Sequence, residues 1–157
     1  REKADYHYKS KMTNAEIFDL PIPDIADPTS VIVLWTTDAH TQFAFECLKH
    51  WGYKISTQVF VWVKLKNGNP VKNVGPWTMK SCESAWLGTR GKAWSTLLKT
   101  QSELQLIMSE RGKHSEKPGE AFDRLDRMFP GTSKIDLFAR RTHPGWDVMG
   151  DEVEEEL

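Results

Sequence analysis

The sequence is poor in the features that mark several classes of protein. Its 157 residues include only two cysteines, Cys47 and Cys82, which are too few for a disulfide framework. The longest apolar runs, such as 31–35 and 59–63, fall far short of the roughly 20 residues that a membrane-spanning helix needs. No signal peptide is recognisable at the start of the chain. We therefore expect a cytoplasmic protein with no membrane partner, folded as a single domain over residues 1–157.

Several motifs that carry catalysis are also missing. The sequence contains no Walker A loop, no G-x-G-x-x-G turn and no G-x-S-x-G elbow. These absences exclude P-loop hydrolysis, standard dinucleotide dehydrogenation and serine esterase chemistry. The five histidines are scattered, and Cys47 and His50 form one C-x-x-H pair with no second pair to complete a metal site. We expect no bound metal.

Charge is balanced overall but not along the chain. The net charge is -1, while residues 64–113 contain nine Lys and Arg against three Glu, and acids gather at 151–156. A basic middle is typical of a surface that faces phosphates, although an ordinary surplus of solvated lysines explains it nearly as well. The candidates for contact with nucleic acid are four lysines: Lys64, Lys66, Lys72 and Lys80.

The first half of the chain predicts a strand, a helix and a second strand. Residues 30–36 (SVIVLWT) are apolar and β-branched without alternation, which is typical of a parallel strand covered on both faces. Apolar residues then recur at helical spacing over 43–51, with Asp38 as the expected cap and Gly52 at the stop. The run 59–63 is the second strand. Together these segments predict a βαβ unit.

The rest of the chain continues the alternation. A capping box at 13–16 predicts a short helix near the start, and Pro118 predicts an amphipathic helix over 118–129. Residues 64–80 are expected to form a long surface loop. Further short strands are expected at 84–89, 104–108 and 134–139. The pattern predicts an α/β fold with a doubly wound, mostly parallel sheet, in which ligands bind beyond the carboxyl ends of the strands.

Three basic residues lie where such a sheet binds anions. Lys117 precedes the second long helix, where its charge meets the positive end of the helix dipole unless an anion such as a carboxylate or phosphate is shared. Arg140 and Arg141 follow the last predicted strand. Simpler explanations exist as well, because Lys117 can swing into water and the arginines can be surface charges near Asp136 or Asp147.

Taken together, these segments resemble a known family. The stretches 114–118 (HSEKP), 129–131 (FPG), 134–141 (KIDLFARR) and 144–152 (PGWDVMGDE) closely resemble the C-terminal signature of the MT-A70 family of S-adenosylmethionine-dependent adenine N6-methyltransferases. Earlier segments follow the family's order too: Tyr8, 12–13 (MT), 20–22 (LPI), 33–37 (VLWTT), 51–53 (WGY) and 61–64 (VWVK). The resemblance spans nearly the whole chain and fits best the small phage and bacterial members, which resemble DNA methyltransferases.

The resemblance implies a Rossmann-like methyltransferase fold with a permuted motif order and S-adenosyl-L-methionine as cofactor. In the family, the lysine of the H-x-x-K-P stretch holds the methionine carboxylate of the cofactor, which assigns that role to Lys117. Arg140 and His143 match ribose-contacting positions, and Asp151 stands where the family commonly has Asn. The implied cofactor-binding residues are Lys117, Asp136, Arg140, His143, Asp151 and Glu152.

The resemblance also implies contacts with nucleic acid. Tyr8 matches an aromatic residue that lies against the target base, and an aromatic ring suits a flipped base. Residues 64–80 and the basic stretch beyond them match the part of the family that faces partners and nucleic acid.

One departure from the family concerns catalysis. The family's signature is Asp-Pro-Pro-aromatic at a strand end, where oxygens accept hydrogen bonds from the adenine amine and orient its nitrogen. The sequence has no Pro-Pro: 27–28 (DP) precedes a strand, and 75–77 (GPW) lacks the acid. The motif would fall immediately before Arg1. Either the chain shown lacks its N-terminal strand and catalytic motif, which leaves the catalytic residues unknown, or the protein is a non-catalytic subunit.

The leading hypothesis is therefore methyl transfer from S-adenosylmethionine to the N6 amine of adenine in nucleic acid, with DNA expected. The alternative is a non-catalytic scaffold of the same fold that binds nucleic acid and a catalytic partner. A homodimer or a homologous subunit fits either hypothesis. A third hypothesis is an α/β domain that uses another nucleotide.

Overall fold

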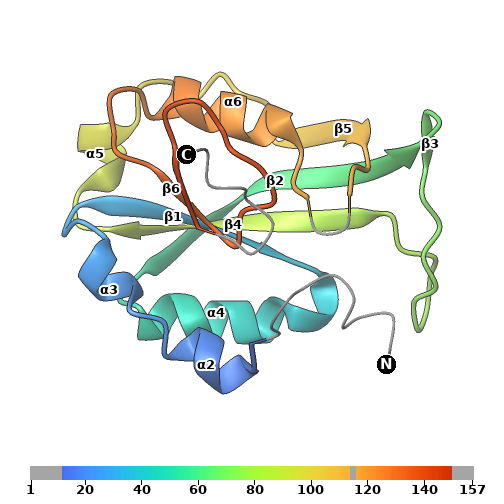
Figure 1. Ribbon diagram of the computed structural model, residues 1–157, viewed down its shortest axis with the longest axis horizontal. Helices are drawn as coiled ribbons and strands as arrows, with labels where there is room; N and C mark the ends of the chain where they lie inside the picture. Colours follow the sequence, from blue (N-terminus) through green and yellow to red (C-terminus); the bar gives the residue numbers. More distant parts are fainter. Residues whose placement is uncertain (1–11, 114–115, 150–157) are drawn as a thin grey trace, which may run out of the picture.

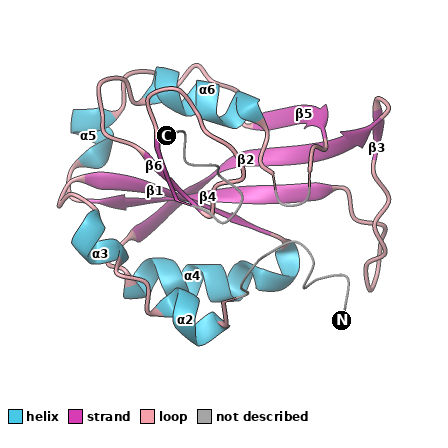
Figure 2. Ribbon diagram, in the orientation of Figure 1, coloured by secondary structure: helices cyan, strands magenta, loops and turns pink. Residues whose placement is uncertain are grey.

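The computed structural model describes residues 12–113 and 116–149 and places most strands in one mixed sheet (Figure 2). The sheet has the order β1-β4-β2-β3, with β5 also paired to β2. Its strands are β1 (Ser30–Thr36), β2 (Lys54–Lys66), β3 (Asn69–Pro70), β4 (Cys82–Arg90) and β5 (Leu106–Glu110). Two further strands, β6 (Ile135–Leu137) and β7 (Asp147–Met149), pair with each other in parallel.

The directions of the strands correct the prediction of a mostly parallel sheet in one respect. β4 is antiparallel to both β1 and β2, so β1 and β2 run in the same direction with β4 inserted between them. β2 and β5 are parallel neighbours. The predicted strand, helix and strand of the βαβ unit are present, but the two strands are not adjacent. A continuous apolar run indicates that both faces of a strand are buried. It does not indicate whether the neighbouring strand is parallel or antiparallel.

Helices cover both faces of the sheet, which confirms the doubly wound α/β class (Figure 1). One face carries α2 (Asn14–Phe18), α3 (Ile22–Ile25) and α4 (Thr41–His50), and the other carries α5 (Ala93–Leu97) and α6 (Gly119–Met128). The 3₁₀ turn η1 (Asp38–His40) joins β1 to α4. No helix in the described part of the chain is long and apolar enough to cross a membrane.

Alternate residues of β1 serve two separate hydrophobic cores. Val31, Val33 and Trp35 pack against the cluster that includes residues of α6, whereas Ile32 and Leu34 pack against the cluster that includes residues of α4. Because both faces of β1 are covered, its sequence shows no alternation of apolar and polar residues.

Local signals place several helix ends. The Thr13 hydroxyl accepts a hydrogen bond from the Glu16 backbone N–H, and the Glu16 carboxylate accepts one from the Thr13 N–H, both at 3.2 Å. This reciprocal pair confirms the capping box of α2. Gly52 follows α4 with φ 83°, a conformation that glycine adopts readily. Asp38 does not cap α4 as predicted, because it begins η1 and accepts a hydrogen bond from the Ala39 N–H at 3.1 Å.

Other boundaries differ from the predicted ones. The strands expected at 59–63 and 84–89 are longer, the strand expected at 104–108 lies two residues later, and Pro118 is the N-cap of α6. The strand expected at 134–139 shortens to β6, because Phe138 takes a left-handed φ of 60°. The sequence does not predict α3, α5 or β7. Each has at most five residues, which is too few to show a periodic pattern.

The predicted loop 64–80 is partly regular. Its first three residues belong to β2, which turns into β3, and the Glu110 carboxylate closes the turn by accepting hydrogen bonds from the N–H groups of Asn67 and Gly68. Asn73 and Lys80 then form an isolated antiparallel bridge. The irregular part that remains is residues 71–81, here named the 71–81 loop.

Candidate functional site

The candidate site lies where the carboxyl ends of β1, β2 and β5 meet (Figure 1). β4 runs in the opposite direction and therefore begins at this end, where it carries Glu83. α6 also begins here, because it follows β5 along the chain. Three charged residues far apart in the sequence, Lys64, Glu83 and Lys117, thus meet at the end of the sheet where α/β folds bind ligands.

Glu83 is a buried carboxylate held between two lysines. Its side chain is 8% exposed, its Oε2 lies 2.8 Å from Lys64 Nζ, and its Oε1 accepts a hydrogen bond from Lys117 Nζ. Burial raises the pKa of Glu83, but the ammonium groups of Lys117 and Lys64 outweigh burial and hold the pKa below its ordinary value. We name these three residues the Glu83 cluster. Two cations and one anion leave the cluster with one positive charge in excess.

Aromatic rings stand beside the Glu83 cluster. Lys117 Nζ lies 5.7 Å from the centre of the Trp35 ring, and Lys64 Nζ lies 5.3 Å from the centre of the Trp62 ring. The two tryptophans meet edge to face, with 6.3 Å between their centroids. The face of an aromatic ring attracts a cation, and the rings displace water that would weaken the ion pairs.

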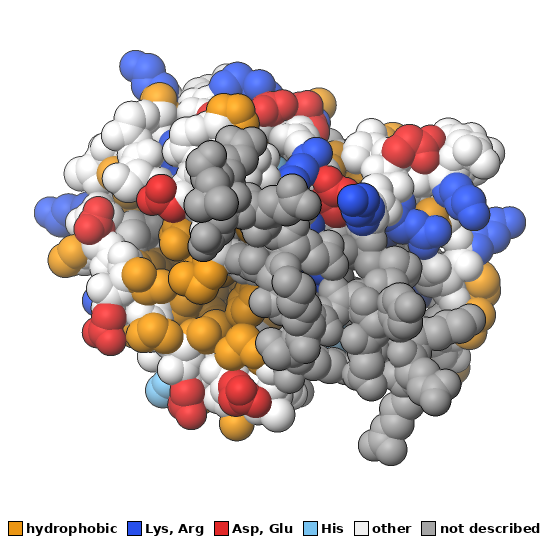
Figure 3. Space-filling model, in the orientation of Figure 1, with side chains coloured by type: hydrophobic (Ala, Val, Ile, Leu, Met, Phe, Trp, Pro, Cys, Tyr) orange, Lys and Arg blue, Asp and Glu red, His pale blue; other side chains and the backbone are white. Residues whose placement is uncertain are grey.

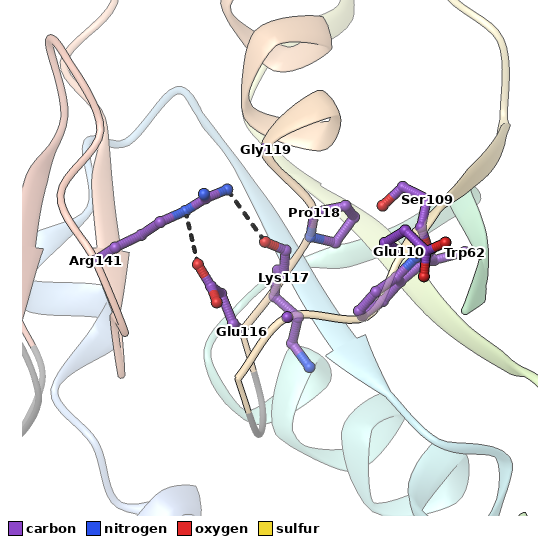
Figure 4. A pocket seen from close by; sticks show the side chains of 9 residues that line it. Trp62, Ser109, Glu110, Glu116, Lys117, Pro118, Gly119 and Arg141 are labelled. Carbon is purple, nitrogen blue, oxygen red and sulfur yellow. Dashed lines mark hydrogen bonds and ion pairs between the residues drawn. The ribbon is translucent and has the colours of Figure 1, made fainter. Parts of the chain in front are cut away.

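A cavity of about 130 Å³ lies at the start of α6 (Figure 4). Arg141 reaches across its edge: Nε lies 3.3 Å from Glu116 Oε1, and Nη2 donates to the Lys117 backbone oxygen at 3.5 Å. Gly119 leaves room for this guanidinium, because a Cβ there would lie 2.8 Å from Arg141 Nη2. The Lys117 carbonyl points toward Arg141 and its side chain points away, toward Glu83 (Figure 4).

Asp136 of β6 is a partly buried carboxyl near these charges. Its Oδ2 lies 3.5 Å from His143 Nε2. Burial raises the pKa of Asp136 to about 6, although the positive charges of Lys117 and Arg141 act against the rise. Burial also lowers the pKa of His143, whose ring is therefore neutral at pH 7 and stacks on Phe122 of α6 with 3.5 Å between ring centres.

The structure brings together part of the predicted cofactor set. Lys117, Asp136 and His143 lie around the start of α6, and Arg140 lies three residues after the end of β6 and is partly buried. The anion that the position of Lys117 predicts is present within the chain as Glu83. The predicted residues that lie outside the described part of the chain are Tyr8, Asp151 and Glu152. Among the described residues, no group of His, Cys, Asp and Glu side chains is arranged to hold a metal ion.

The four lysines predicted to face nucleic acid separate into two kinds. Lys64 belongs to the Glu83 cluster, and Lys80 Nζ lies 2.5 Å from Asp38 Oδ2, which lowers the pKa of Asp38. Lys66 and Lys72 are exposed, and neither has an ion pair within residues 12–113 and 116–149. The exposed pair is therefore available to an outside anion, whereas Lys64 and Lys80 already have one inside the chain.

Sequence reasoning missed Glu83, which organises the site. A signal was available, because Glu83 is the only acidic residue between positions 64 and 102. A lone acid at the start of a buried strand, inside a basic stretch, needs cations close to it. The sequence pattern predicts strands around Trp35 and Trp62 but no role for either ring at the site.

The fold and the site define a Rossmann-like α/β protein with a buried, positively charged cluster at the carboxyl ends of its strands. The MT-A70 family model matches residues 1–152. The chain belongs to the MT-A70 family, whose methyltransferases use S-adenosylmethionine as the methyl donor. This finding confirms the family that the sequence motifs resemble.

Named relatives of the chain come from bacteria, plants and animals. The Type II methyltransferase M.MunI of Mycoplasma sp is 33% identical over 138 residues, which are 88% of this chain and 57% of that protein. A putative N(6)-adenosine-methyltransferase MT-A70-like protein of Medicago truncatula is 31% identical over 147 residues, 90% of this chain and 23% of that protein. The human N(6)-adenosine-methyltransferase catalytic subunit METTL3 is 28% identical over 148 residues, 91% of this chain and 25% of that protein. The chain spans little more than half the length of M.MunI and about a quarter of the other two.

Proposed function

We propose that this chain is the methyl-transfer domain of an S-adenosylmethionine-dependent methyltransferase that acts on the N6 amine of adenine in DNA. Family membership supports the reaction class. The observation that carries the proposal for this chain is the Glu83 cluster, in which two lysines share one carboxylate where an α/β fold binds ligands.

Lys117 is the residue that we expect to hold the methionine carboxylate of the cofactor. A second carboxylate would balance the charge that Glu83 leaves uncompensated on the two lysines. Lys117 also lies just before α6, a helix of ten residues whose first backbone N–H groups favour an anion. A charge-assisted hydrogen bond of this kind contributes about 1.5–3 kcal/mol.

Asp136 fits the ribose hydroxyls of the cofactor. Its pKa is raised because burial removes water from around the carboxylate. Two sugar hydroxyls would donate to the ionised form and compensate for the lost water. Arg140 and His143 follow on the same segment, and Asp151 and Glu152 complete the set that the family resemblance implies.

The cofactor supplies an activated methyl group on its sulfonium sulfur. The chain itself binds the cofactor and the adenine and orients them, because the adenine amine is a weak nucleophile that must be held close to the methyl group. Tyr8 is expected to stack on the flipped base. The oxygen acceptors that orient the amine in the family belong to the Asp-Pro-Pro-aromatic motif, which these 157 residues do not contain.

The resemblance to the small phage and bacterial members of the family, which resemble DNA methyltransferases, supports DNA as the substrate. The chain is 33% identical to M.MunI, a type II methyltransferase, against 28% to human METTL3.

The second candidate function is a non-catalytic scaffold that binds nucleic acid and a catalytic partner, and the missing Pro-Pro favours it. The unpaired edges of the sheets are relevant to the choice between the catalytic and the scaffold function. In the described part of the chain, β1 pairs with β4 and β6 pairs with β7, so one edge of each stays open for a further strand. For the catalytic function, we propose that a strand from outside the described residues pairs with these open edges and carries the oxygen acceptors for the adenine amine.

Transfer of an isotopically labelled methyl group separates the two functions. The assay uses adenine-containing duplex DNA, single-stranded DNA and RNA of the same sequence, with the 157-residue chain and with a version extended by residues encoded upstream. We expect the extended version to methylate DNA and the 157-residue chain not to, because misplacing the reacting atoms by about 1 Å costs about a hundredfold in rate.

Two outcomes would change the proposal. Cofactor binding without methyl transfer by the extended version would favour the scaffold. Robust turnover by the 157-residue chain would mean that residues present in it orient the amine, and Asp38, which follows β1, would be the first to test.

A further inference from the structure

The 71–81 loop exposes an unusual amount of apolar surface. Trp77 is 93% exposed, Val74 is 89% exposed and Met79 is 52% exposed. Among the exposed large hydrophobic residues in the described part of the chain, Trp77 has the highest fraction. A tryptophan usually buries much of its large ring, so a fully exposed one at a loop tip marks a contact surface.

The loop that carries Trp77 is held in place at its base. The backbone N–H groups of Asn73 and Lys80 each donate to the other's carbonyl, at 2.9 and 2.6 Å. The Ser81 hydroxyl donates to the carbonyl of the buried Val71 at 2.7 Å, and the Lys80 ammonium pairs with Asp38. These bonds fix the direction in which the loop projects.

The inside of the loop is closely packed. A Cβ at Gly75 would lie 2.5 Å from the Thr78 carbonyl oxygen, so the chain folds back on itself there. The tight turn leaves the Trp77 ring outside, in water, at the tip of an anchored hairpin-like segment.

The sequence around Trp77 is positively charged. Between positions 64 and 82 the chain has four lysines and no acid; Lys80 is paired with Asp38, and Lys66 and Lys72 are exposed without an ion pair in the described residues. Figure 3 shows Lys and Arg side chains beside hydrophobic ones at the end of the molecule where β3 and this loop project. That end also contains the Glu83 cluster, because the carboxyl ends of β1 and β2 lie there.

We propose that Trp77 stacks on a base of the nucleic acid while Lys66 and Lys72 contact its phosphates. An exposed ring and exposed cations on one stretch of chain are the combination that binds bases and backbone together. The cores of protein–protein interfaces are depleted in lysine, so the charge pattern favours nucleic acid over a protein partner. The inference rests on the proposed function, which needs nucleic acid at this end of the sheet, and adds a residue that holds it.

Binding of a fluorescent single-stranded DNA that contains adenine, measured by anisotropy without cofactor, tests the inference. Trp77→Ala should weaken binding about 5- to 150-fold, the loss of one stacked base. Trp77→Phe keeps an aromatic face and should recover most of the affinity. The matched control is Trp94→Ala on α5, an exposed tryptophan at the opposite end of the sheet, which should bind like the unsubstituted chain.

The salt dependence separates stacking from charge. Trp77→Ala should leave the slope of log affinity against log salt unchanged, because no ion is released by a stacked ring. Replacing Lys66 and Lys72 together with Gln should flatten that slope by about 1.4, the value for two contacts to a single strand. Melting temperatures of all variants show whether each one is folded.

Three results would overturn the inference: equal binding by Trp77→Ala and the unsubstituted chain, no DNA binding by either, or a change in oligomeric state of Trp77→Ala in sedimentation velocity, which would make the loop a contact between copies. Cofactor binding is measured separately by calorimetry. A normal cofactor affinity beside any of these results would remove Trp77 from the nucleic-acid surface and leave the proposed cofactor site intact.

Discussion

The Glu83 cluster and the base of the 71–81 loop each contain an ion pair between a lysine and a carboxylate, but in opposite surroundings. The Glu83 side chain is 8% exposed, whereas the side chain of Asp38, which pairs with Lys80 of the loop, is 69% exposed. Burial strengthens an ion pair and makes its disruption costly, whereas solvent and salt screen an exposed pair. Two lysines with the same predicted role therefore differ in the folded chain: Lys64 belongs to the buried Glu83 cluster, and Lys80 anchors an exposed loop.

The largest effect is expected from Glu83→Gln. This substitution removes the anion that Lys64 and Lys117 share and leaves two partly buried cations without it, which should lower the free energy of unfolding by as much as about 3–5 kcal/mol. Urea denaturation followed by tryptophan fluorescence measures the change. Asp38→Asn is the matched control and should change stability far less. Equal losses from the two variants would contradict the division into a buried and an exposed pair.

The strands could be predicted better than their arrangement. The run 30–36 gave the bounds of β1 because burial on both faces leaves a continuous apolar signature. The insertion of β4 between β1 and β2 could not be predicted, because strand order depends on contacts between distant segments. The candidate site, too, could be predicted only in part. Lys117 stands out through its place before a helix, whereas its partner Glu83 lies 34 positions away and is found only in the folded chain.

Asp136, the carboxyl of β6 beside the Glu83 cluster, gives a prediction that depends on pH. Its pKa is raised from 3.8 to about 6 in the folded state, so the folded state binds the proton more tightly than the unfolded state. The stability that this proton provides is fully present below about pH 4 and is lost as the pH rises through about 6. Asp136→Asn should therefore become more stable relative to the unsubstituted chain as the pH rises through that range.

Denaturation curves at several pH values between about 4 and 8 measure this effect. Asp123→Asn, an exposed substitution on α6, is the control for a surface carboxylate. A difference between Asp136→Asn and the unsubstituted chain that stays constant across this pH range would show that Asp136 does not titrate as described.

The smallest effect concerns salt. Exposed charges are screened at high ionic strength and buried pairs much less. The small stability difference between Lys80→Gln and the unsubstituted chain should disappear in about 1 M NaCl, where the screening length falls to about 3 Å. The difference for Lys117→Gln should persist. If salt abolished both differences equally, Lys117 would have to be as solvated as Lys80.

The central claim is that the Glu83 cluster uses Lys117 to hold the carboxylate of S-adenosylmethionine. Isothermal titration calorimetry with S-adenosylmethionine and its demethylated product tests it most directly, on the unsubstituted chain, Lys117→Ala and the control Lys80→Ala. We predict that Lys117→Ala loses about 1.5–3 kcal/mol of binding free energy, the scale of a charge-assisted hydrogen bond, while Lys80→Ala binds normally. An unchanged affinity of folded Lys117→Ala would contradict the claim and remove Lys117 from the cofactor site.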